Sequence, residues 1–170
     1  MGQTVEQDYG LQDEVKGRYL TFWIDKQLFA VSIADVVQIV GMQDITQLPD
    51  YPHYVKGVID LRGQIIPLVD VRLRFGKAEI PYSDRTCIII ISVKENHFGL
   101  IVDEVDEVTD IPSEKIAPPP KVNIDQTNSY LTGIAQLEST TEKNRIALLL
   151  DTLKIISKTE LLVKAEAKQK

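Results

Sequence analysis

Short apolar runs joined by polar turns follow one another along the chain. The run RYLTFWI at 18–24 is rich in aromatic and β-branched side chains, and the turn DKQ separates it from LFAV at 28–31. TCIIIISV at 86–93 is followed in the same way by KEN and then by HFGLIV at 97–102. Apolar runs of this length, joined by so few polar residues, predict β-hairpins.

The hairpins occur in two copies and in the same order. Three blocks of the first copy align with three of the second: residues 25–31 with 94–100, 54–58 with 130–134, and 65–70 with 146–151. The offset grows from 69 to 76 to 81 positions, so the copies differ by insertions in loops. Matches that keep their order indicate an internal duplication. We therefore expect two barrel-forming halves, about residues 18–77 and 84–153.

Short strands with turns between them favour small barrels, because closing a sheet removes its exposed edges. The predicted fold is mainly β, with about five strands in each half, a short helix and a C-terminal helix. The short helix is expected in SIADVVQIV at 32–40, where Ser32 can cap the start. Its apolar face would hold Ile33, Val36, Val37 and Val40.

The C-terminal helix is expected to begin at Asp151 and Thr152 and to run through 153–167. Its partial apolar side would hold Leu153, Ile156, Leu161 and Val163. The acidic stretch 103–111 fits a helix or a strand, and APPP at 117–120 predicts an extended connection rather than a strand. Residues 1–16 are expected to be disordered and residues 161–170 to fray, which leaves one domain over 17–160.

Composition restricts the possible functions. The chain has 170 residues, 44% of them hydrophobic, and a net charge of −6 with no basic stripe, so nucleic acid and anionic lipid are poor partners. No apolar run approaches the roughly 20 residues of a membrane span, and the first residues do not resemble a secretory signal. We therefore expect a cytoplasmic protein without membrane insertion.

No catalytic or metal-binding constellation is visible in the sequence. His53 and His97 are isolated, whereas zinc needs three or four ligands. Cys87 lies in an apolar run and is interpreted as a small buried hydrophobe. Nucleotide-binding glycine motifs are absent, and the acidic cluster at 103–110 lacks the spacing of a calcium loop. The sequence predicts no enzyme activity, no cofactor and no metal.

One feature occurs in a single copy. Gly57 and Gly133 occur at matched positions and are expected to allow close backbone packing or positive φ. The pair Arg62-Gly63 has no counterpart in the second copy, so building the hairpin does not require it. Arg62 is either an exposed turn residue paired with Asp60 or Asp70, or an arginine held at a tip, with Gly63-Gln64 as the turn, to contact a partner.

Four segments carry a resemblance to a known family. They are KGVIDLRGQIIPLVDVRLRF at 56–75, FAVSIADVVQIV at 29–40, FGLIVDEVDEV at 98–108, and YLTGIAQL at 130–137 with LLLD at 148–151. In this order they resemble CheW, the family of chemotaxis coupling proteins, over about residues 16–160. The resemblance implies two small five-stranded SH3-like β-barrels packed together with a groove between them. With no room for a receiver or kinase domain, the chain resembles a stand-alone CheW rather than a module of a larger protein.

The resemblance also implies a function. CheW proteins are non-enzymatic adaptors that couple methyl-accepting chemoreceptors to the histidine kinase CheA in arrays beneath the membrane. The positions that match the receptor-binding groove are Val36 and Ile39, placed on the short helix, with Gly57, Arg62, Gly63, Ile88 and Gly99. The positions that match the site for the kinase regulatory domain are Val40, Gly41, Gln43, Asp44, Ile45 and Lys56.

The chain departs from the family pattern at two places. Asp60 stands where an asparagine is common. Ala117 and Val122 replace the arginine and the aromatic residue of the second, ring-closing kinase contact, and both lost types are favoured interface anchors. Two alternatives to an adaptor are a small-barrel binder of ligands or nucleic acid, which would need an aromatic and basic face, and a hydrolase.

Overall fold

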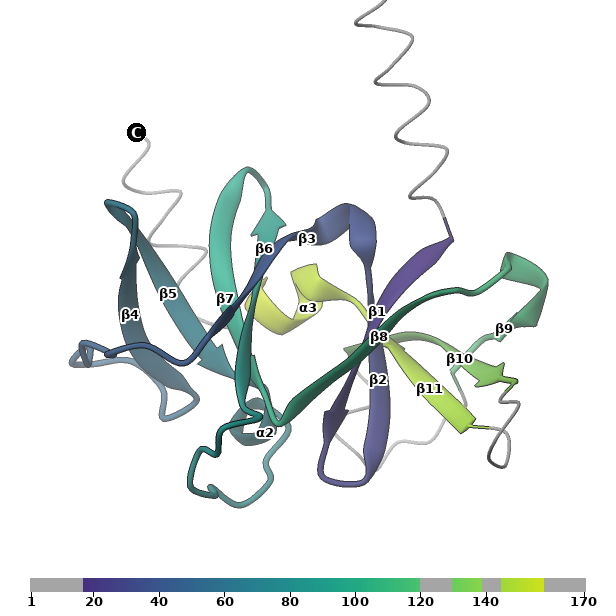
Figure 1. Ribbon diagram of the computed structural model, residues 1–170, viewed down its shortest axis with the longest axis horizontal. Helices are drawn as coiled ribbons and strands as arrows, with labels where there is room; N and C mark the ends of the chain where they lie inside the picture. Colours follow the sequence, from purple (N-terminus) through teal and green to yellow (C-terminus); the bar gives the residue numbers. More distant parts are fainter. Residues whose placement is uncertain (1–16, 120–129, 139–144, 158–170) are drawn as a thin grey trace, which may run out of the picture.

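The computed structural model describes residues 17–119, 130–138 and 145–157, and in these ranges the chain forms eleven strands and a few short helical segments (Figure 1). The strands are β1 (Arg18–Ile24), β2 (Gln27–Ser32), β3 (Val36–Gly41), β4 (Val55–Leu61), β5 (Gln64–Asp70), β6 (Cys87–Val93), β7 (Asn96–Val102), β8 (Glu104–Asp110), β9 (Ile116–Ala117), β10 (Leu131–Leu137) and β11 (Arg145–Leu150). The helical segments are η1 (Ile33–Asp35), α2 (Val71–Arg74), η2 (Ser113–Lys115) and α3 (Thr152–Ser157).

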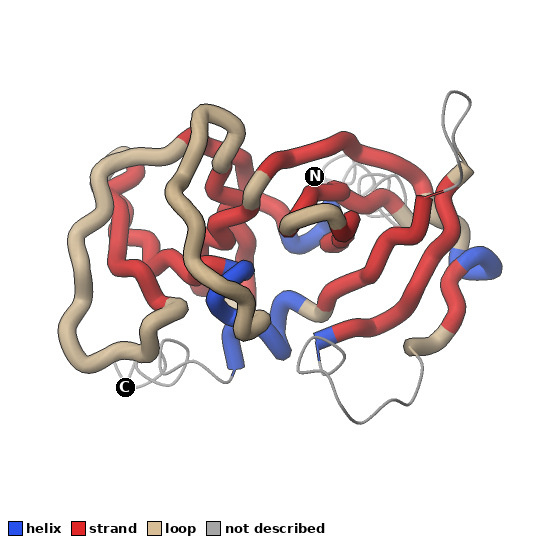
Figure 2. Tube along the Cα trace, turned by 90° about the horizontal axis from the view of Figure 1, so that it is seen from below, coloured by secondary structure: helices blue, strands red, loops and turns tan. Residues whose placement is uncertain are grey.

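The strands form two sheets that lie side by side. One has the order β8-β1-β2-β11-β10-β9 and the other β3-β6-β7-β5-β4, and we call the barrels built on them barrel A and barrel B. In Figure 1 the purple β1 and β2 lie beside the yellow-green β11 in barrel A. Figure 2 shows the two groups of strands, with helical segments near the junction between them.

Each barrel combines strands from both halves of the sequence, so the expectation that residues 18–77 and 84–153 form one barrel each is wrong. The parallel pairs β2–β11 and β5–β7 both join strands from different halves. Because the two copies are alike, their apolar patterns fit pairing within a half and pairing between halves equally well. The sequence therefore predicts the strands but not which copy each strand pairs with.

The duplication is confirmed by the register of the strands. Leu68 of β5 lies opposite Gly99 of β7, and the matched residues Leu149 and Ala30 lie opposite each other in β11 and β2. The pairs β1–β8 and β3–β6 correspond in the same way, and each contains a bulge at the matched position. Barrels A and B are therefore related by the repeat, strand by strand.

The two matched glycines lie where each barrel closes. Thr46 forms two backbone hydrogen bonds with Val58 of β4, at 2.8 and 2.9 Å, and Ala117 of β9 pairs with the matched residue of β10, Ile134. Gly57 and Gly133 immediately precede the two strand residues, and a Cβ on either would lie under 3.0 Å from an atom of the closing segment. The expectation of close backbone packing at both glycines is confirmed, and Gly57 also has a φ of 141°.

The largest apolar core lies between the barrels. It contains the outward-facing residues of β1, β2, β6 and β7 together with both short α-helices, while smaller clusters fill each barrel. At its edge Arg74 is buried, and its guanidinium carbon lies 4.6 and 4.8 Å from the ring centroids of Tyr54 and Tyr130, which are matched in the repeat. Fixing both barrels against one arginine and one core makes the barrels a single packed unit.

Four sequence predictions need correction or completion. The helix expected at 32–40 is a single 3₁₀ turn, capped by Ser32 as expected, and the chain then continues as strand β3. The acidic stretch at 103–111 is strand β8, and Ala117 belongs to the short strand β9 rather than to an unpaired connection. Helix α3 buries Ile155 and Ile156 but exposes Leu153. β3 and β8 extend because each pairs with a neighbouring strand, and this pairing overrides the local helical spacing.

Several expectations fall outside the described residues. These are the disorder of 1–16, the fraying of 161–170, the apolar positions Leu161 and Val163, and the departure from the family pattern at Val122. Within the described ranges, no helix has the length and apolar character required to cross a membrane.

Candidate functional site

Arg62 lies at the tip of the β4–β5 hairpin. Leu61 pairs with Gln64, so the turn residues are Arg62 and Gly63, with φ angles of 54° and 86°. The turn therefore begins one residue earlier than the Gly63-Gln64 turn expected from the sequence. A two-residue turn with both φ angles positive matches the twist of the flanking strands, but the first position usually holds asparagine, aspartate or glycine. Arginine at this position has an unfavourable backbone conformation.

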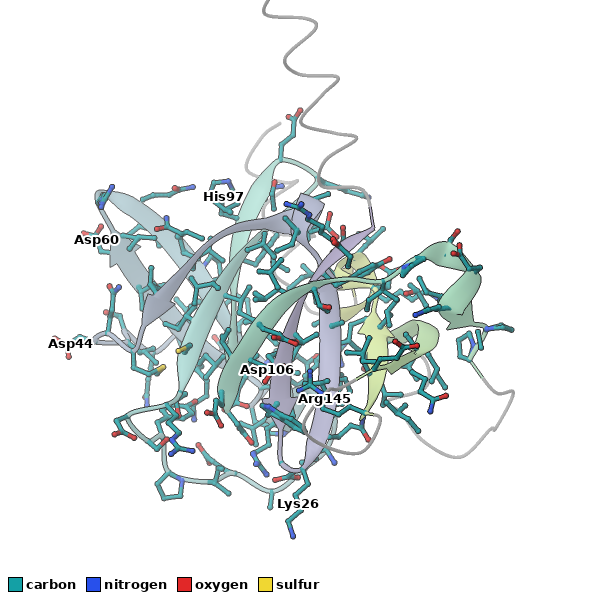
Figure 3. All side chains as sticks on the ribbon, turned by 45° about the vertical axis from the view of Figure 1, so that its right-hand side comes forward. Lys26, Asp44, Asp60, His97, Asp106 and Arg145 are labelled. Atoms are coloured by element: carbon teal, nitrogen blue, oxygen red, sulfur yellow. The ribbon has the colours of Figure 1, made fainter. Side chains whose placement is uncertain are left out.

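The Asp60 side chain holds this turn in place. Its Oδ1 accepts a hydrogen bond of 2.8 Å from the backbone N–H of Gly63. Figure 3 shows Asp60 at the outer end of the hairpin. The carboxylate of Asp60 thus accepts a hydrogen bond from a turn N–H group that faces solvent. The bond also restrains the backbone of Arg62, which lies between Asp60 and Gly63 with Leu61.

Arg62 forms no salt bridge with any residue that the structure describes. Asp60 bonds to the Gly63 amide, and Asp70 accepts hydrogen bonds from the Tyr82 hydroxyl at 2.8 Å and from the Leu73 amide at 3.2 Å. The interpretation that Arg62 pairs with Asp60 or Asp70 is therefore wrong. The guanidinium is exposed, and its five N–H donors are directed to solvent or to a partner.

Apolar side chains are exposed near this hairpin and on the edge strand β3. Ile65, three residues after Arg62, is 60% exposed, and Val37 and Ile39 of β3 are 44% and 43% exposed. Val36 is half-buried and packs against the core between the barrels. Val37 and Ile65 were not among the residues predicted to bind a partner. The alternation along β5 indicates that Ile65 faces outward, whereas the exposure of Val37 depends on the bulge in β3.

Three of the seven residues matched to the receptor groove are buried. Gly57, Ile88 and Gly99 lie inside barrel B, where Ile88 has no exposed surface. A Cβ on Gly99 would lie under 3.0 Å from the side chains of Leu68 and Ile88. A partner at the surface cannot touch these three buried residues, so their assignment as direct contact residues is wrong. They shape the surface from beneath, while Val36, Ile39, Arg62 and Gly63 have accessible atoms.

The six residues matched to kinase binding lie at the end of β3, on the segment that follows it and on β4. Gly41, Gln43 and Asp44 are exposed, and Asp44 lies at the outer edge of the molecule in Figure 3. Val40 and Ile45 are half-buried against the cluster inside barrel B. The backbone of this segment is fixed by the two hydrogen bonds of the neighbouring Thr46 to β4.

Lys56 has a partner within the chain. Its Nζ lies 2.5 Å from Glu79 Oε1 and 5.8 Å from the centroid of the Tyr82 ring. The hydrogen bond and the charge of Lys56 lower the pKa of Glu79. Burial, followed by the hydrogen bond to Asp70, raises the pKa of Tyr82, so its hydroxyl stays protonated and continues to donate to Asp70. The loop that holds Glu79 and Tyr82 thus lies beside Lys56.

A shallow depression separates the tips of the two hairpins of barrel B. It is lined by Gln64, Ile65, Pro67, Glu95, Asn96, His97 and Phe98. Gln64 Nε2 lies 3.0 Å from His97 Nδ1, which ties the β4–β5 hairpin to the β6–β7 hairpin. In Figure 3, His97 lies at the same end of the molecule as Asp60. This bond fixes the position of the Arg62 turn relative to β7.

The described residues provide little support for the alternative functions. Phe22 and Phe29 are buried in the core, so neither can stack on a nucleotide base. Within the described ranges, no three histidine, cysteine, aspartate or glutamate side chains are grouped so that they could hold a metal ion. Cys87 is half-buried rather than fully buried, and its Sγ lies 3.3 Å from the carbonyl oxygen of Arg85.

Comparison with known proteins gives a consistent result. The family model described as CheW-like domain matches residues 18–160. The chain is 29% identical to the chemotaxis protein CheW of Klebsiella aerogenes over 149 residues, which are 88% of this chain and 87% of that protein. It is 34% identical to the chemotaxis protein CheW of Rhizobium meliloti over 119 residues, which are 70% and 77% of the two chains.

A solved structure is similar as well. The crystal structure of the scaffolding protein TtCheW from Thermoanaerobacter tengcongensis superposes with a TM-score of 0.71 at 32% sequence identity. The match covers 80% of this chain and 84% of that one. Two packed barrels, as expected from the resemblance, are thus found in the described residues and agree with this match.

Proposed function

The chain belongs to the CheW-like domain family, and on this premise we propose that it is a non-enzymatic adaptor of bacterial chemotaxis. It couples methyl-accepting chemoreceptors to the histidine kinase CheA and helps to build receptor–kinase arrays. Its place in the cell is then the cytoplasm, at the arrays beneath the membrane. The two barrels pack against each other over a common core, so such an adaptor would present its surfaces on one packed unit.

One observation supports this proposal above the others. Arg62 is held in an unfavourable backbone conformation at an exposed tip, without a salt bridge to any described residue, and its hairpin counterpart in the repeat lacks the Arg-Gly pair. A residue that costs conformational energy and forms no ion pair with the described part of the chain indicates a role in binding. Arginine is favoured at the centre of interfaces, where its planar group forms several hydrogen bonds.

The receptor surface is proposed on barrel B. The occupant would be the tip of a receptor, a helical hairpin with an apolar stripe. Ile39 and the accessible part of Val36 would meet the stripe, and Arg62 and Gly63 would contact polar groups beside it. Gly57, Ile88 and Gly99 would act indirectly, because they set the position of the strands that carry this surface.

The kinase surface is proposed on the end of β3 and the segment that follows it. Gly41, Gln43 and Asp44 are exposed there, and Val40 and Ile45 are held by the barrel interior. Lys56 would contribute after exchange of its ion pair with Glu79, a pair with little net energy because Glu79 is exposed. The second kinase contact of the family would be weaker here, since Ala117 and Val122 lack the usual anchor types.

Each contact need not be strong. A dissociation constant in the micromolar range corresponds to about 8 kcal/mol, and an array adds avidity because each adaptor is held at more than one place. The adaptor function therefore requires two surfaces that can be occupied at the same time. Ile65 belongs to β5 and Val37 to β3, whereas Asp44 belongs to the segment after β3, so the two proposed surfaces involve different elements.

The test is titration calorimetry of the purified chain with a receptor-tip fragment and with a CheA regulatory domain, first separately and then together. We expect binding to each in the micromolar range, one of each per chain, and no competition between them. A chain that is folded by circular dichroism and binds neither fragment would refute the adaptor function. Competition between the two fragments would refute the separate surfaces.

A further inference from the structure

Exposed apolar residues occur at matched positions on both barrels. Ile39 of β3 corresponds to Val108 of β8, and Ile65 of β5 corresponds to Ile146 of β11. Val108 and Ile146 are 55% and 56% exposed, against 43% and 60% for Ile39 and Ile65 on barrel B. Apolar exposure alone therefore does not explain why a helical partner would bind barrel B rather than barrel A.

The barrels differ at two neighbouring matched positions. At the bulge of the edge strand, barrel B has Val37 and barrel A has Asp106, and at the start of the returning hairpin strand, barrel B has Gln64 and barrel A has Arg145. In barrel A these two side chains are bonded to each other, with 3.0 Å between Arg145 Nη1 and Asp106 Oδ2. Figure 3 shows the two side chains beside each other on barrel A.

The ion pair of barrel A has further support. Arg145 Nη2 lies 3.0 Å from Glu107 Oε1, so one guanidinium joins two consecutive carboxylates of β8. The hydroxyl of Thr21, which is fully buried on β1, lies 2.9 Å from Asp106 Oδ2 and accepts a bond of 3.1 Å from the Glu107 amide. Arg145 and Asp106 are themselves mostly shielded from solvent. Thr21 lies opposite Ala30 and Arg145 lies opposite Leu137, and both partners belong to the cluster inside barrel A. The network therefore ties β8 to β11 on the inner side of the sheet, at the rim of the barrel.

Barrel B has no such tie among its described residues at these positions. Gln64 is directed to His97 instead, and Val37 remains exposed on the bulge. The matched position of Thr21 is Ile90, which is buried and carries no hydroxyl. The region between β3 and the Arg62 hairpin therefore presents an apolar side chain where barrel A presents a bonded charge network.

We propose that the Arg145–Asp106 ion pair determines specificity by closing the rim of barrel A at a place where barrel B, with Val37 and Gln64, leaves its rim open to a helical partner. An apolar helix that docked on barrel A would remove water from Arg145, Asp106 and Glu107 without providing new partners for them, which is unfavourable. On barrel B the same helix would bury Val37, which is favourable. This inference rests on the proposed receptor binding by barrel B.

The test rebuilds the ion pair on barrel B with Val37→Asp and Gln64→Arg, made singly and together. The probe is the receptor-tip fragment, and affinity and thermal unfolding are measured for each variant. We expect Val37→Asp to weaken binding at least tenfold. We expect the double variant to bind no better than Val37→Asp, although it melts at a higher temperature because the new charges pair.

The double variant distinguishes two explanations for a loss of affinity in Val37→Asp. One is that the ion pair closes the docking surface, and the other is that the added negative charge repels the partner. The charges of the double variant cancel, so repulsion alone predicts that Gln64→Arg restores the affinity lost in Val37→Asp, and such a recovery would overturn the proposal. Wild-type affinity in Val37→Asp would overturn it as well. A wild-type chain that does not bind the receptor tip would instead refute the proposed function.

A matched variant on barrel A completes the test. Arg145→Gln removes the ion pair without changing barrel B, so its affinity for the receptor tip should stay within twofold of wild type while its melting temperature falls. A folded Arg145→Gln variant that loses receptor binding would place Arg145 in the receptor site and overturn the proposal.

Discussion

Gly57 of β4 lies against the backbone of Thr46 so closely that no side chain fits between them. A Cβ at residue 57 would lie under 3.0 Å from the carbonyl oxygen and carbon of Thr46, a separation that real Cβ atoms do not show. The carbonyl oxygen of Thr46 also accepts a 2.8 Å hydrogen bond from the amide of Val58. The contact thus closes barrel B with backbone on both sides, and the segment that follows β3 is held by it.

Gly57→Ala should destabilise the protein strongly. The substituted residue would have to keep a φ of 141° or push the Thr46 backbone away and break its hydrogen bonds to Val58. We expect a loss of about 3 kcal/mol in the free energy of unfolding, since strained backbone and overpacking each cost on the order of 1–3 kcal/mol. Urea unfolding followed by circular dichroism measures it.

Gly133→Ala is the matched control, because it occupies the same place in barrel A. Its Cβ would first meet Cγ2 of Ile116, a side-chain methyl that can move by rotation about χ1 rather than a backbone atom, and would lie 3.2 Å from the carbonyl oxygen of Ala117. Its backbone φ is not in the left-handed range that strains an alanine. We expect a loss of about 1 kcal/mol. Equal losses at the two positions would contradict this account of Gly57.

The strands were predictable from the sequence because each apolar run has a turn at its end. The β6 and β7 hairpin, for example, is formed where TCIIIISV, KEN and HFGLIV predict it. The exchange of strands between the halves was not predictable, because the copies have the same apolar pattern. The helical spacing of residues 32–40 was misleading, since β3 is extended by its pairing with β6 and the bulge changes which side chains face outward.

The candidate site was predictable only in part. The single occurrence of Arg62-Gly63 identified the exposed tip without any structure, and Gly57 was identified by its repetition. The burial of Ile88 and Gly99 follows from tertiary packing that the resemblance does not specify. The role of Arg145 depends on its side-chain contact with Asp106. The two residues are 39 positions apart in the sequence, so the contact follows only from the way that β8 and β11 are brought together.

Asp35 should make the stability of the protein depend on pH. Burial raises its pKa, the hydrogen bond from Thr152 opposes this shift, and the nearby charge of Asp151 adds to it. The folded state therefore holds the proton of Asp35 more tightly than the unfolded state. This contribution to stability is complete below a pH of about 4, the value for an unfolded aspartate, and is lost as the pH rises through the folded pKa.

Asp35→Asn should therefore stabilise the protein near neutral pH relative to wild type, and the difference should shrink toward pH 4. The asparagine oxygen can still accept the bond from Thr152, whose hydroxyl lies 3.3 Å from the carboxylate. Urea unfolding at pH 4, 5, 6 and 7 tests this expectation, with the exposed Asp44→Asn as a control. A difference that is constant over this range would show that burial of the charge is not the cause.

Arg62→Ala should leave stability nearly unchanged and weaken binding. Arg62 has no salt bridge to a described residue, so the free energy of unfolding should change by less than about 0.5 kcal/mol. If Arg62 is an interface anchor, the affinity for the receptor tip should fall at least tenfold, about 1.4 kcal/mol or more. Lys26→Ala, at the exposed tip of the β1–β2 hairpin in Figure 3, is the matched control and should bind as wild type. Equal losses in both variants would indicate a nonspecific effect of charge.

Asp60→Ala should release the turn that presents Arg62. It removes the acceptor for the Gly63 amide, and a hydrogen bond of this kind contributes about 1 kcal/mol. The Gly63 amide should then exchange its hydrogen faster, and the affinity for the receptor tip should fall several-fold because Arg62 is no longer held in one conformation. Asp60→Asn keeps an acceptor oxygen and removes the charge, so it should retain both the slow exchange and the affinity. Faster exchange in Asp60→Ala without any loss of affinity would show that the partner does not need the turn to be ordered in advance. Equal weakening in both variants would show that it is the negative charge of Asp60 that the partner recognises.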